Sequence, residues 1–327
     1  MKIGFHLENL TFRGTTNAVK DYAHFNEALL DNESIFFYKK GLLDLNVDEN
    51  CSKRNEVFKS VQDRYEIFEY SDIDDLEKKV KQHGCDYAYF LKSGFNDGVV
   101  LKDTKSLIHC VFNNYQPHGY KYLYVSSWLA REATKDDTLY IPHIVDVPRF
   151  NTEDFRIKLN IPKDKIVVGR YGGFDQFDIP FVKETIAYVV SNDPDFVFIF
   201  VNTRKFIDHP NVIFLNAIID PQEKTNYITS CDAMIHARSD GESFGLSICE
   251  FLFHYKPVFS FGGGRDKNNV FMLDKYGLIY NNQYELLDKL FKLKYNFYND
   301  DYRYEGIVQP FNPENVMNRF DELFLRD

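Results

Sequence analysis

Two glutamates separated by seven residues, Glu242 and Glu250, have the residue type and spacing to hold hydroxyl groups of a ligand. Carboxylate oxygens accept hydrogen bonds from neighbouring hydroxyls such as those of a ribose. Glu250 stands between Cys249 and Phe251 in an apolar run, and a charge in such surroundings needs a partner. That partner is either a ligand or the backbone, because Ser247 and Glu250 also fit a capping box, in which the glutamate bonds to the first free amide of a helix.

The segment that must position these glutamates has the pattern of a strand, a loop, a helix and a second strand. Both strands are apolar throughout, which indicates a parallel sheet with the loop at its carboxyl edge, where open α/β sheets bind ligands. Gly245 would let a ligand approach the backbone, and the amides near Phe244 and Leu246 would face anionic or hydroxyl oxygens. The four elements are expected at residues 233–237, 241–245, 246–254 and 258–261.

A second candidate binding residue, Arg170, ends the apolar run 166–169 and is followed by Gly172 and Gly173. A guanidinium group suits phosphate, because it can donate two parallel hydrogen bonds to it. The alternative is an ion pair at the edge of a domain. We therefore expect Arg170 and the two glycines to form a phosphate-binding turn.

Composition limits the classes of function. The chain has 327 residues, 44% of them hydrophobic, and a net charge of -10 without a long basic run, which argues against a nucleic-acid partner. Five cysteines without close pairs predict free thiols in a reducing compartment and no zinc site. No signal peptide and no apolar stretch of membrane-spanning length are present, so we expect a cytoplasmic protein that would meet a membrane only peripherally.

Strand-like and helix-like segments alternate along the chain, which predicts an α/β architecture. A proline-bracketed extended segment, 142–148, reads as an interdomain linker. We therefore predict an N-terminal domain at 1–147, a second domain at 148–308, and a closing helix at 309–327.

The sequence Glu-Ser-Phe-Gly-Leu that begins at Glu242, the arginine turn and the linker together resemble the retaining nucleotide-sugar glycosyltransferases of family GT4. This resemblance covers nearly the whole chain. It implies the GT-B fold, with two Rossmann-like domains that face one another across a cleft and with the closing helix, 309–327, crossing back to the first domain. It also implies transfer of a sugar from a UDP- or GDP-sugar bound to the second domain, with retained anomeric configuration. The acceptor would be a glycan, a lipid or a small molecule bound to the first domain.

The same resemblance implies roles for individual residues. Glu242 would hold the hydroxyls of the donor sugar, Glu250 the ribose, and Arg170 the diphosphate. His109 would face the donor sugar, with His118 as its competitor, although a lone histidine is more often structural. Further donor contacts are implied for Gly14, Gly172, Gly173, Asn216, Phe244, Gly245 and Leu246.

One departure from the family pattern affects the phosphate site, and a separate observation bears on metal. A Lys-Gly that usually follows the arginine is replaced by the segment 174–178, so Arg204 or Lys205 would supply the second positive charge. No Asp-x-Asp ends a strand, because Asp193-Pro194-Asp195 precedes an apolar run. We therefore expect a reaction without metal or cofactor. The alternatives are a nucleotide-sugar epimerase or hydrolase of the same fold, and a non-catalytic sugar-nucleotide-binding protein.

Overall fold

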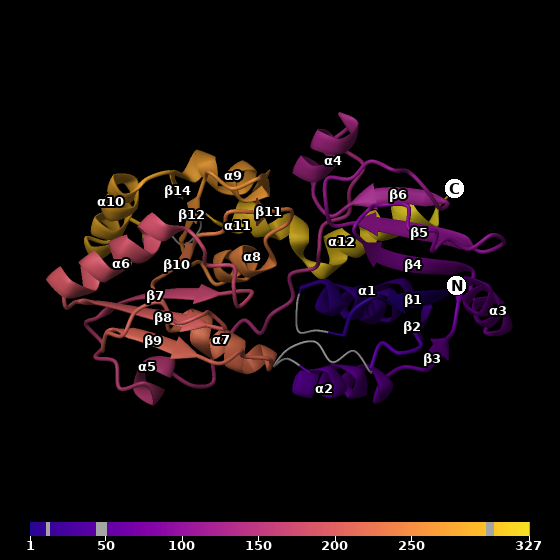
Figure 1. The fold of residues 1–327 in the computed structure, drawn as a ribbon, viewed down its shortest axis with the longest axis horizontal. Coiled ribbons are helices and arrows are strands. Elements are labelled where there is room, and N and C mark those ends of the chain that lie inside the picture. Colours follow the sequence, from indigo (N-terminus) through magenta and orange to yellow (C-terminus); the bar gives the residue numbers. More distant parts are fainter. Residues whose placement is uncertain (11–13, 44–50, 299–303, 327) are drawn as a thin grey trace. The chain divides into compact units, whose positions relative to one another are not determined.

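The structure of the protein is a computed structural model that describes residues 1–10, 14–43, 51–298 and 304–326. It divides into two compact units (Figure 1). The first unit comprises Met1–Ile144 together with Phe311–Asp327, and the second comprises Val145–Pro310. Each unit is a parallel sheet with helices packed on it, as the alternation of strand and helix patterns predicts.

The first unit is built on a six-stranded sheet in the order β3-β2-β1-β4-β5-β6, and all of its strand pairs are parallel. Every residue of β4 is buried, which is typical of a parallel strand covered on both faces. The strands are β1 (Lys2–Leu7), β2 (Glu33–Lys39), β3 (Ile67–Tyr70), β4 (Tyr87–Lys92), β5 (Lys105–Cys110) and β6 (Lys121–Tyr124). The helices are α1 (Gly14–Leu30), α2 (Cys51–Gln62), α3 (Ile73–Gln82) and α4 (Ser127–Thr134).

The end of the chain also belongs to the first unit. Helix α12 (Pro313–Phe320) continues into a π-helical turn, η4 (Asp321–Leu325), and packs against α1. Helix α12 begins directly after Asn312, whose side chain accepts a hydrogen bond from the amide of Asn315. A proline occupies the first helical position. Phe320 stacks on Tyr22 of α1 with ring centroids 5.4 Å apart. These buried rings fix the closing helix to the N-terminal sheet.

The second unit repeats the same plan with the order β14-β12-β10-β7-β8-β9. Its main strands are β7 (Ile166–Tyr171), β8 (Phe196–Val201), β9 (Val212–Leu215), β10 (Ala233–His236), β12 (Val258–Phe261) and β14 (Ile279–Tyr280), and β11 (Gly241–Glu242) pairs separately with β13 (Asp266–Lys267). Its helices are α5 (Phe155–Lys158), α6 (Pro180–Asn192), α7 (Pro221–Thr229), α8 (Leu246–Phe253), α9 (Asn268–Leu273), α10 (Gln283–Lys294) and α11 (Glu305–Val308), with 3-10 turns η1 (Asp274–Tyr276) and η3 (Gln309–Phe311).

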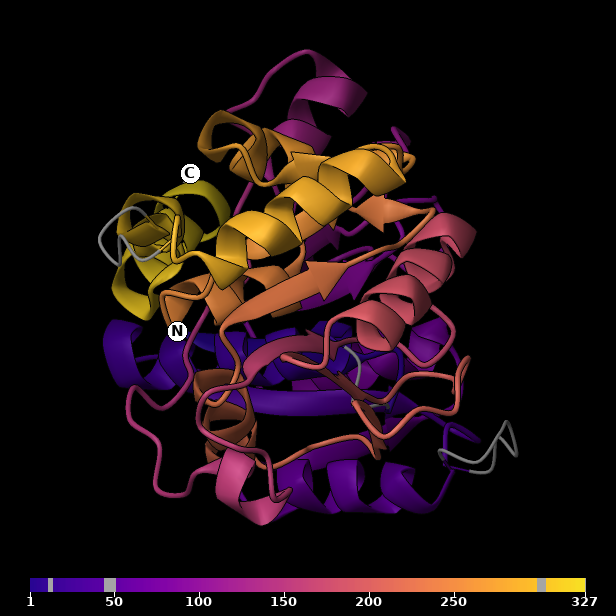
Figure 2. The same ribbon diagram turned by 90° about the vertical axis from the view of Figure 1, so that its left-hand side faces the viewer.

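Helices cover the sheet of the second unit closely. Helices α6 and α10 lie together on one face of it (Figure 2). Tyr227 of α7 and Phe251 of α8 pack directly against Gly169 of β7. A Cβ atom on this glycine would lie 2.7 Å from the Tyr227 hydroxyl and 3.2 Å from the ring of Phe251. Only glycine permits this approach of helix to strand.

The strand order of the second unit contains a switch point between β7 and β10. From β7 the chain proceeds to β8 and β9, whereas from β10 it proceeds to β12 and β14 on the other side. The connections that follow β7 and β10 therefore diverge, and open α/β sheets bind ligands outside the carboxyl ends of such strands. None of the described helices is long and apolar enough to cross a membrane.

Candidate functional site

Arg170 lies near the carboxyl end of β7 with its side chain almost completely buried. Its guanidinium donates to the carbonyl of Asn202 at 3.0 Å, the hydroxyl of Thr203 at 2.7 Å and the carbonyl of Gly173 at 2.8 Å. All three acceptors are neutral, and no carboxylate in the described part of the chain forms an ion pair with it. Burial lowers the pKa of Arg170 to about 10, so the group stays charged at neutral pH. The carboxylate of Glu242 acts on Arg170 through a Coulombic interaction that raises its pKa, but makes no ion pair with it. A buried cation without an ion pair favours an anionic ligand.

The glycine turn after β7 lies directly against this guanidinium. A Cβ atom on Gly172 would lie 2.9 Å from Nη2 of Arg170, so a larger residue would push the guanidinium away. The side-chain amide of Asn202 donates to the carbonyl of Gly172 at 2.8 Å and joins the turn to the end of β8. Gly172 and Gly173 therefore hold the arginine in place.

Glu242 is the first of the two glutamates and follows β10 in the neighbouring loop. His236 contacts one of its carboxylate oxygens at 3.0 Å, and Arg238 donates to the other at 3.2 Å. Burial by itself raises the pKa of Glu242, but the hydrogen bonds from His236 and Arg238 outweigh it and leave the pKa lowered. The carboxylate is thus ionised, and each oxygen keeps lone pairs for further donors.

The loop that carries Glu242 is tied to the segment after β12. Strand β11 pairs in parallel with β13, and the amide of Asp266 donates to the carbonyl of Asp240 at 2.8 Å. Gly241 has a φ of 68°, and a Cβ atom there would lie 1.9 Å from the carbonyl oxygen of Asp266. This contact is possible only for glycine, so the loop has one well-defined course.

Glu250, the second glutamate, lies on α8 and is 3% exposed. Lys224 of α7 donates to its Oε1 atom at 2.6 Å, while Oε2 is buried and has no hydrogen-bond partner. The capping-box alternative is wrong, because α8 begins at Leu246 with Gly245 as its N-cap, and Ser247 lies inside the helix. Glu250 therefore keeps one buried acceptor oxygen for a ligand hydroxyl.

The beginning of α8 has the backbone conformation that the sequence requires. Gly245 has a φ of 96°, in the left-handed region that favours glycine. The buried Phe244 has its carbonyl bonded by the amide of Asn268 at 2.6 Å. The amides of Leu246, Ser247 and Ile248 have no acceptor within the helix, whereas that of Cys249 donates to the carbonyl of Gly245 at 3.1 Å.

The residues predicted to supply a second positive charge are engaged elsewhere. Arg204 forms an exposed ion pair with Asp175 at 2.7 Å, and Lys205 pairs with Asp208 at 2.8 Å. Asn216 is exposed directly after the edge strand β9. The cations closest to the two glutamates are instead Lys224 and Arg238.

The aspartates near the site also have partners. Besides the pairing of Asp175, the carboxylate of Asp178 accepts the amide of Ser239 at 2.8 Å, and Asp240 pairs with Arg265 at 3.2 Å. Among the described residues, no group of three or more His, Cys, Asp or Glu side chains is placed to hold a metal ion.

His109 belongs to the first unit and is completely buried in it. Its Nε2 atom contacts the carbonyl of Ile141 at 2.9 Å and that of Tyr124 at 3.2 Å, while Nδ1 contacts the Tyr89 hydroxyl at 2.7 Å. Because carbonyls only accept, Nε2 carries the proton and Nδ1 accepts from the tyrosine. Burial lowers the pKa of His109 to about 4, so the ring is neutral. This environment favours the structural alternative for His109.

The other candidates of the first unit are more accessible. His118 is half-buried, with Nδ1 bonded to the carbonyl of Gln116 at 2.6 Å and Nε2 without a partner. Gly14 is the exposed first residue of α1, and the preceding loop residues 11–13 lie outside the described part of the chain. Both residues belong to the first unit.

Sequence reasoning missed three residues of the cluster, namely Lys224, His236 and Arg238. The last two could have been found, because polar side chains at the end of an apolar strand point to the carboxyl edge of a parallel sheet. Lys224 gives no such signal, since it lies on a different helix, 26 residues before its partner Glu250.

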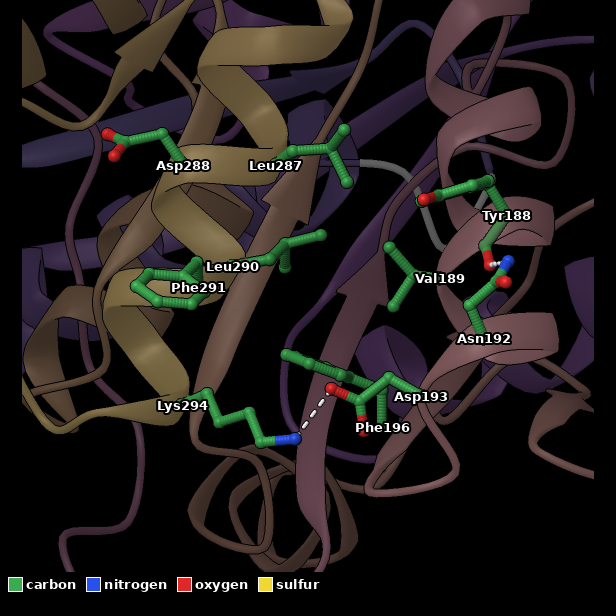
Figure 3. Close-up of a pocket in the computed structure, with 10 residues that line it drawn as sticks. All are labelled: Tyr188, Val189, Asn192, Asp193, Phe196, Leu287, Asp288, Leu290, Phe291 and Lys294. Carbon is green, nitrogen blue, oxygen red and sulfur yellow. Dashed lines mark hydrogen bonds and ion pairs between the residues drawn. The ribbon is translucent and has the colours of Figure 1, made fainter.

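An apolar cavity of about 350 Å³ lies elsewhere in the second unit, between α6 and α10 (Figure 3). Tyr188, Leu287 and Phe291 are among its walls, and the ion pair of Asp193 and Lys294, 2.6 Å long, stands at one end. It reaches the amino end of β8, whereas Arg170 is at the carboxyl end of β7. The cavity is therefore separate from the polar cluster.

Comparison with known proteins finds matches in structure only. No protein-family model and no curated protein matches the sequence. A glycosyltransferase from Rickettsia africae matches with a TM-score of 0.69 at 12% identity, over 100% of this chain and 99% of that one. HepE from Anabaena, in complex with UDP and glucose, matches with a TM-score of 0.68 at 14% identity, over 98% of both chains.

A protein described as a putative UDP-N-acetylglucosamine 2-epimerase from Listeria monocytogenes also matches, with a TM-score of 0.58 at 10% identity, over 100% of this chain and 97% of that one. At these identities the matches establish the fold. Two six-stranded parallel α/β units that match glycosyltransferase structures over the full length show that the chain has the GT-B fold, which confirms the predicted fold class.

Proposed function

We propose that the chain is a retaining glycosyltransferase that moves a sugar from a UDP- or GDP-sugar to a glycan, a lipid or a small-molecule acceptor. The observation that carries this proposal is the combination of Arg170, a buried cation that makes no ion pair among the described residues, with the buried carboxylate of Glu250 and the half-buried carboxylate of Glu242 at the same switch point. A sugar nucleotide has the matching groups, namely a diphosphate and two sets of hydroxyls. The GT-B fold, and HepE in complex with UDP and glucose, add support.

Each residue of the cluster has a distinct part in this proposal. As the bond between the anomeric carbon and the diphosphate breaks, negative charge develops on the leaving group and needs fixed donors. Arg170 and the first amides of α8 supply them. Glu242 accepts hydroxyls of the donor sugar, and Glu250 accepts a ribose hydroxyl with its unpartnered oxygen. The acceptor hydroxyl bonds to the anomeric carbon, and its proton leaves with the nucleoside diphosphate.

Transfer without a metal ion is part of the proposal. A magnesium-bound diphosphate normally needs one or two carboxylates within reach. Asp175, Asp178 and Asp240 are instead bonded to Arg204, Ser239 and Arg265. In this proposal Arg170 neutralises the diphosphate.

Binding of sugar nucleotides tests the proposal directly. Thermal unfolding is measured with UDP-glucose, UDP-galactose, GDP-mannose and the free diphosphates. A donor present at a hundred times its dissociation constant adds about 2.7 kcal/mol to the free energy of unfolding. A stabilising donor is then incubated with candidate acceptors, and the anomeric configuration of the product is determined by NMR. Absence of stabilisation by every sugar nucleotide would refute the proposal.

The epimerase or hydrolase alternative has a specific observation in its favour, the structural match to the protein described as an epimerase. Such an enzyme changes its sugar nucleotide when no acceptor is present. Mass and NMR analysis of the donor after incubation without acceptor distinguishes it from a transferase. A non-catalytic binding protein would leave the donor unchanged with and without acceptor.

We further propose that the protein acts in a reducing compartment such as the cytoplasm. The structure describes the side chains of four of its cysteines, and all four are free thiols, three of them fully buried. Unpaired buried cysteines persist where thiols are kept reduced.

A further inference from the structure

A chain of buried hydrogen bonds runs beneath Glu242 and has no part in the function proposed so far. The amide nitrogen of Asn269 donates to the Ser260 hydroxyl at 2.8 Å, this hydroxyl lies 2.9 Å from Nδ1 of His236, and Nε2 of His236 lies 3.0 Å from the carboxylate of Glu242. Ser260 and Asn269 are completely buried, and His236 is 6% exposed. These hydrogen bonds join β10, β12 and α9 to the loop that carries Glu242.

The direction of these hydrogen bonds follows from what each group is able to donate. The side-chain nitrogen of Asn269 can only donate a hydrogen bond, so the hydroxyl oxygen of Ser260 is the acceptor. The hydrogen of the Ser260 hydroxyl is then left for Nδ1 of His236, which places the ring proton on Nε2. Nε2 in turn donates to the carboxylate of Glu242. Asn269 and Ser260 thus select the tautomer of His236 that can hold Glu242.

Glu242 needs such support because of where it lies. It stands on a two-residue strand between Gly241 and Gly245, which both have positive φ. Arg238 holds its other oxygen, but that guanidinium also lies 3.6 Å from the carboxylate of Asp240. With His236 on one oxygen and Arg238 on the other, the plane of the carboxylate is fixed, and its remaining lone pairs are presented to a ligand.

We propose that His236 is a positioning residue for Glu242, and that the chain from Asn269 through Ser260 to His236 sets the recognition of the sugar half of the donor. The inference rests on the proposed function, because it takes the ligand of Glu242 to be the donor sugar. Recognition of the nucleotide half belongs to Arg170, Glu250 and α8, which lie outside this chain of hydrogen bonds.

The test compares affinities for a sugar nucleotide and for the nucleoside diphosphate alone, measured by calorimetry with UDP-glucose and UDP, and with GDP-mannose and GDP. The two variants are matched. In His236→Asn, the amide keeps a contact with Ser260 but is too short to reach Glu242. In His236→Gln, the longer side chain places its amide nitrogen near the position of Nε2 and donates to Glu242.

We expect His236→Asn to bind the sugar nucleotide about tenfold more weakly, the effect of one hydrogen bond to a charged group, with unchanged affinity for the diphosphate. His236→Gln should recover most of this loss. If His236→Asn does not fold, Ser260→Ala takes its place, with an expected loss of about threefold for the sugar nucleotide alone, because the ring tautomer is no longer fixed.

Other outcomes would overturn the inference. A merely structural network predicts that both affinities fall together or that neither changes. If the wild-type protein binds the diphosphate and the sugar nucleotide equally, Glu242 makes no sugar contact and the positioning role is refuted, while the nucleotide site stands. If it binds neither, the proposed function itself fails.

Discussion

At the scale of single residues, Arg170 gives the sharpest expectation. Arg170→Ala should lower kcat for transfer about 10²- to 10³-fold, which corresponds to about 3 to 4 kcal/mol, the cost of removing one preorganised donor from developing charge. Because this cation replaces a metal ion in the proposal, wild-type transfer should persist in excess EDTA. Steady-state kinetics with and without EDTA check both statements.

Arg131→Ala is the control for this variant, since Arg131 is a half-exposed arginine of the first unit whose guanidinium lies 3.8 Å from the carboxylate of Glu132. Its kinetics should equal those of the wild type. Loss of wild-type activity in EDTA with recovery on addition of manganese would contradict the account of the leaving group. In that case Asp175 and Asp178 would be the first candidate metal ligands.

The ion pair of Lys224 and Glu250 gives a second expectation. Lys224→Met leaves the Glu250 carboxylate buried without a counter-ion, which should cost about 3 to 5 kcal/mol of unfolding free energy. Adding Glu250→Gln to that variant should restore most of this loss, because the buried charge is removed. Urea unfolding of the two single variants and the double variant measures the coupling.

The exposed pair of Lys292 and Asp288 serves as the control for the buried pair. Lys292→Met should cost less than about 0.5 kcal/mol, since exposed ion pairs contribute little. Additive effects of Lys224→Met and Glu250→Gln would show that the two groups do not interact.

Glu250→Gln alone should raise the dissociation constant of the donor more than it lowers kcat, since a ribose contact is made equally in the ground and transition states.

At the scale of elements, the sequence predicts what local patterns determine. The apolar runs that became β10 and β12 and the helix α8 lie where they were predicted, because each is determined by its own hydrophobic pattern. The partner of Glu250 was left open in the sequence, since Ser247 and Glu250 fit a capping box and the glutamate also fits a ligand contact. In the structure, α8 starts directly after Gly245, so Ser247 lies inside the helix. The carboxylate of Glu250 is then bonded to Lys224 instead of the backbone.

The start of α8 gives an expectation that separates backbone strain from ligand binding. Gly245 and Gly277 both have left-handed backbones, with φ of 96° and 68°. Alanine at either position should cost about 1 kcal/mol of stability. A Cβ atom on Gly245 would lie 3.4 Å from the Cβ of Glu242, whereas nothing lies within 4 Å of one on Gly277. Only Gly245→Ala should weaken sugar-nucleotide binding, measured by calorimetry, and equal binding by both variants would contradict this role.

At the scale of the whole molecule, the alternation of strands and helices and the length of the chain were enough to predict two α/β units. Both features can be seen in this one sequence and need no similar sequence for comparison. Burial of individual polar residues was not predictable in the same way. In the sequence, His109 lies near the end of a strand, as a site residue would. Its burial, however, depends on Tyr89 of β4 and on carbonyls of β6 and of the segment before Pro142. Such long-range contacts leave no local pattern.

Buried neutral histidines make the first unit sensitive to acid. Burial lowers the pKa of His109 to about 4 and that of His143 to about 3, against about 6.5 in an unfolded chain. Between about pH 6.5 and 4 the unfolded state therefore binds more protons than the folded state, and the stability falls as the pH falls. Each histidine contributes up to about 1.4 kcal/mol per pH unit in that window. His109→Gln should flatten the dependence by about that amount, because its amide does not titrate. Urea unfolding at pH 7.5, 6.0 and 5.0 measures the slopes, and identical slopes for the variant and the wild type would show that His109 is protonated in the folded protein.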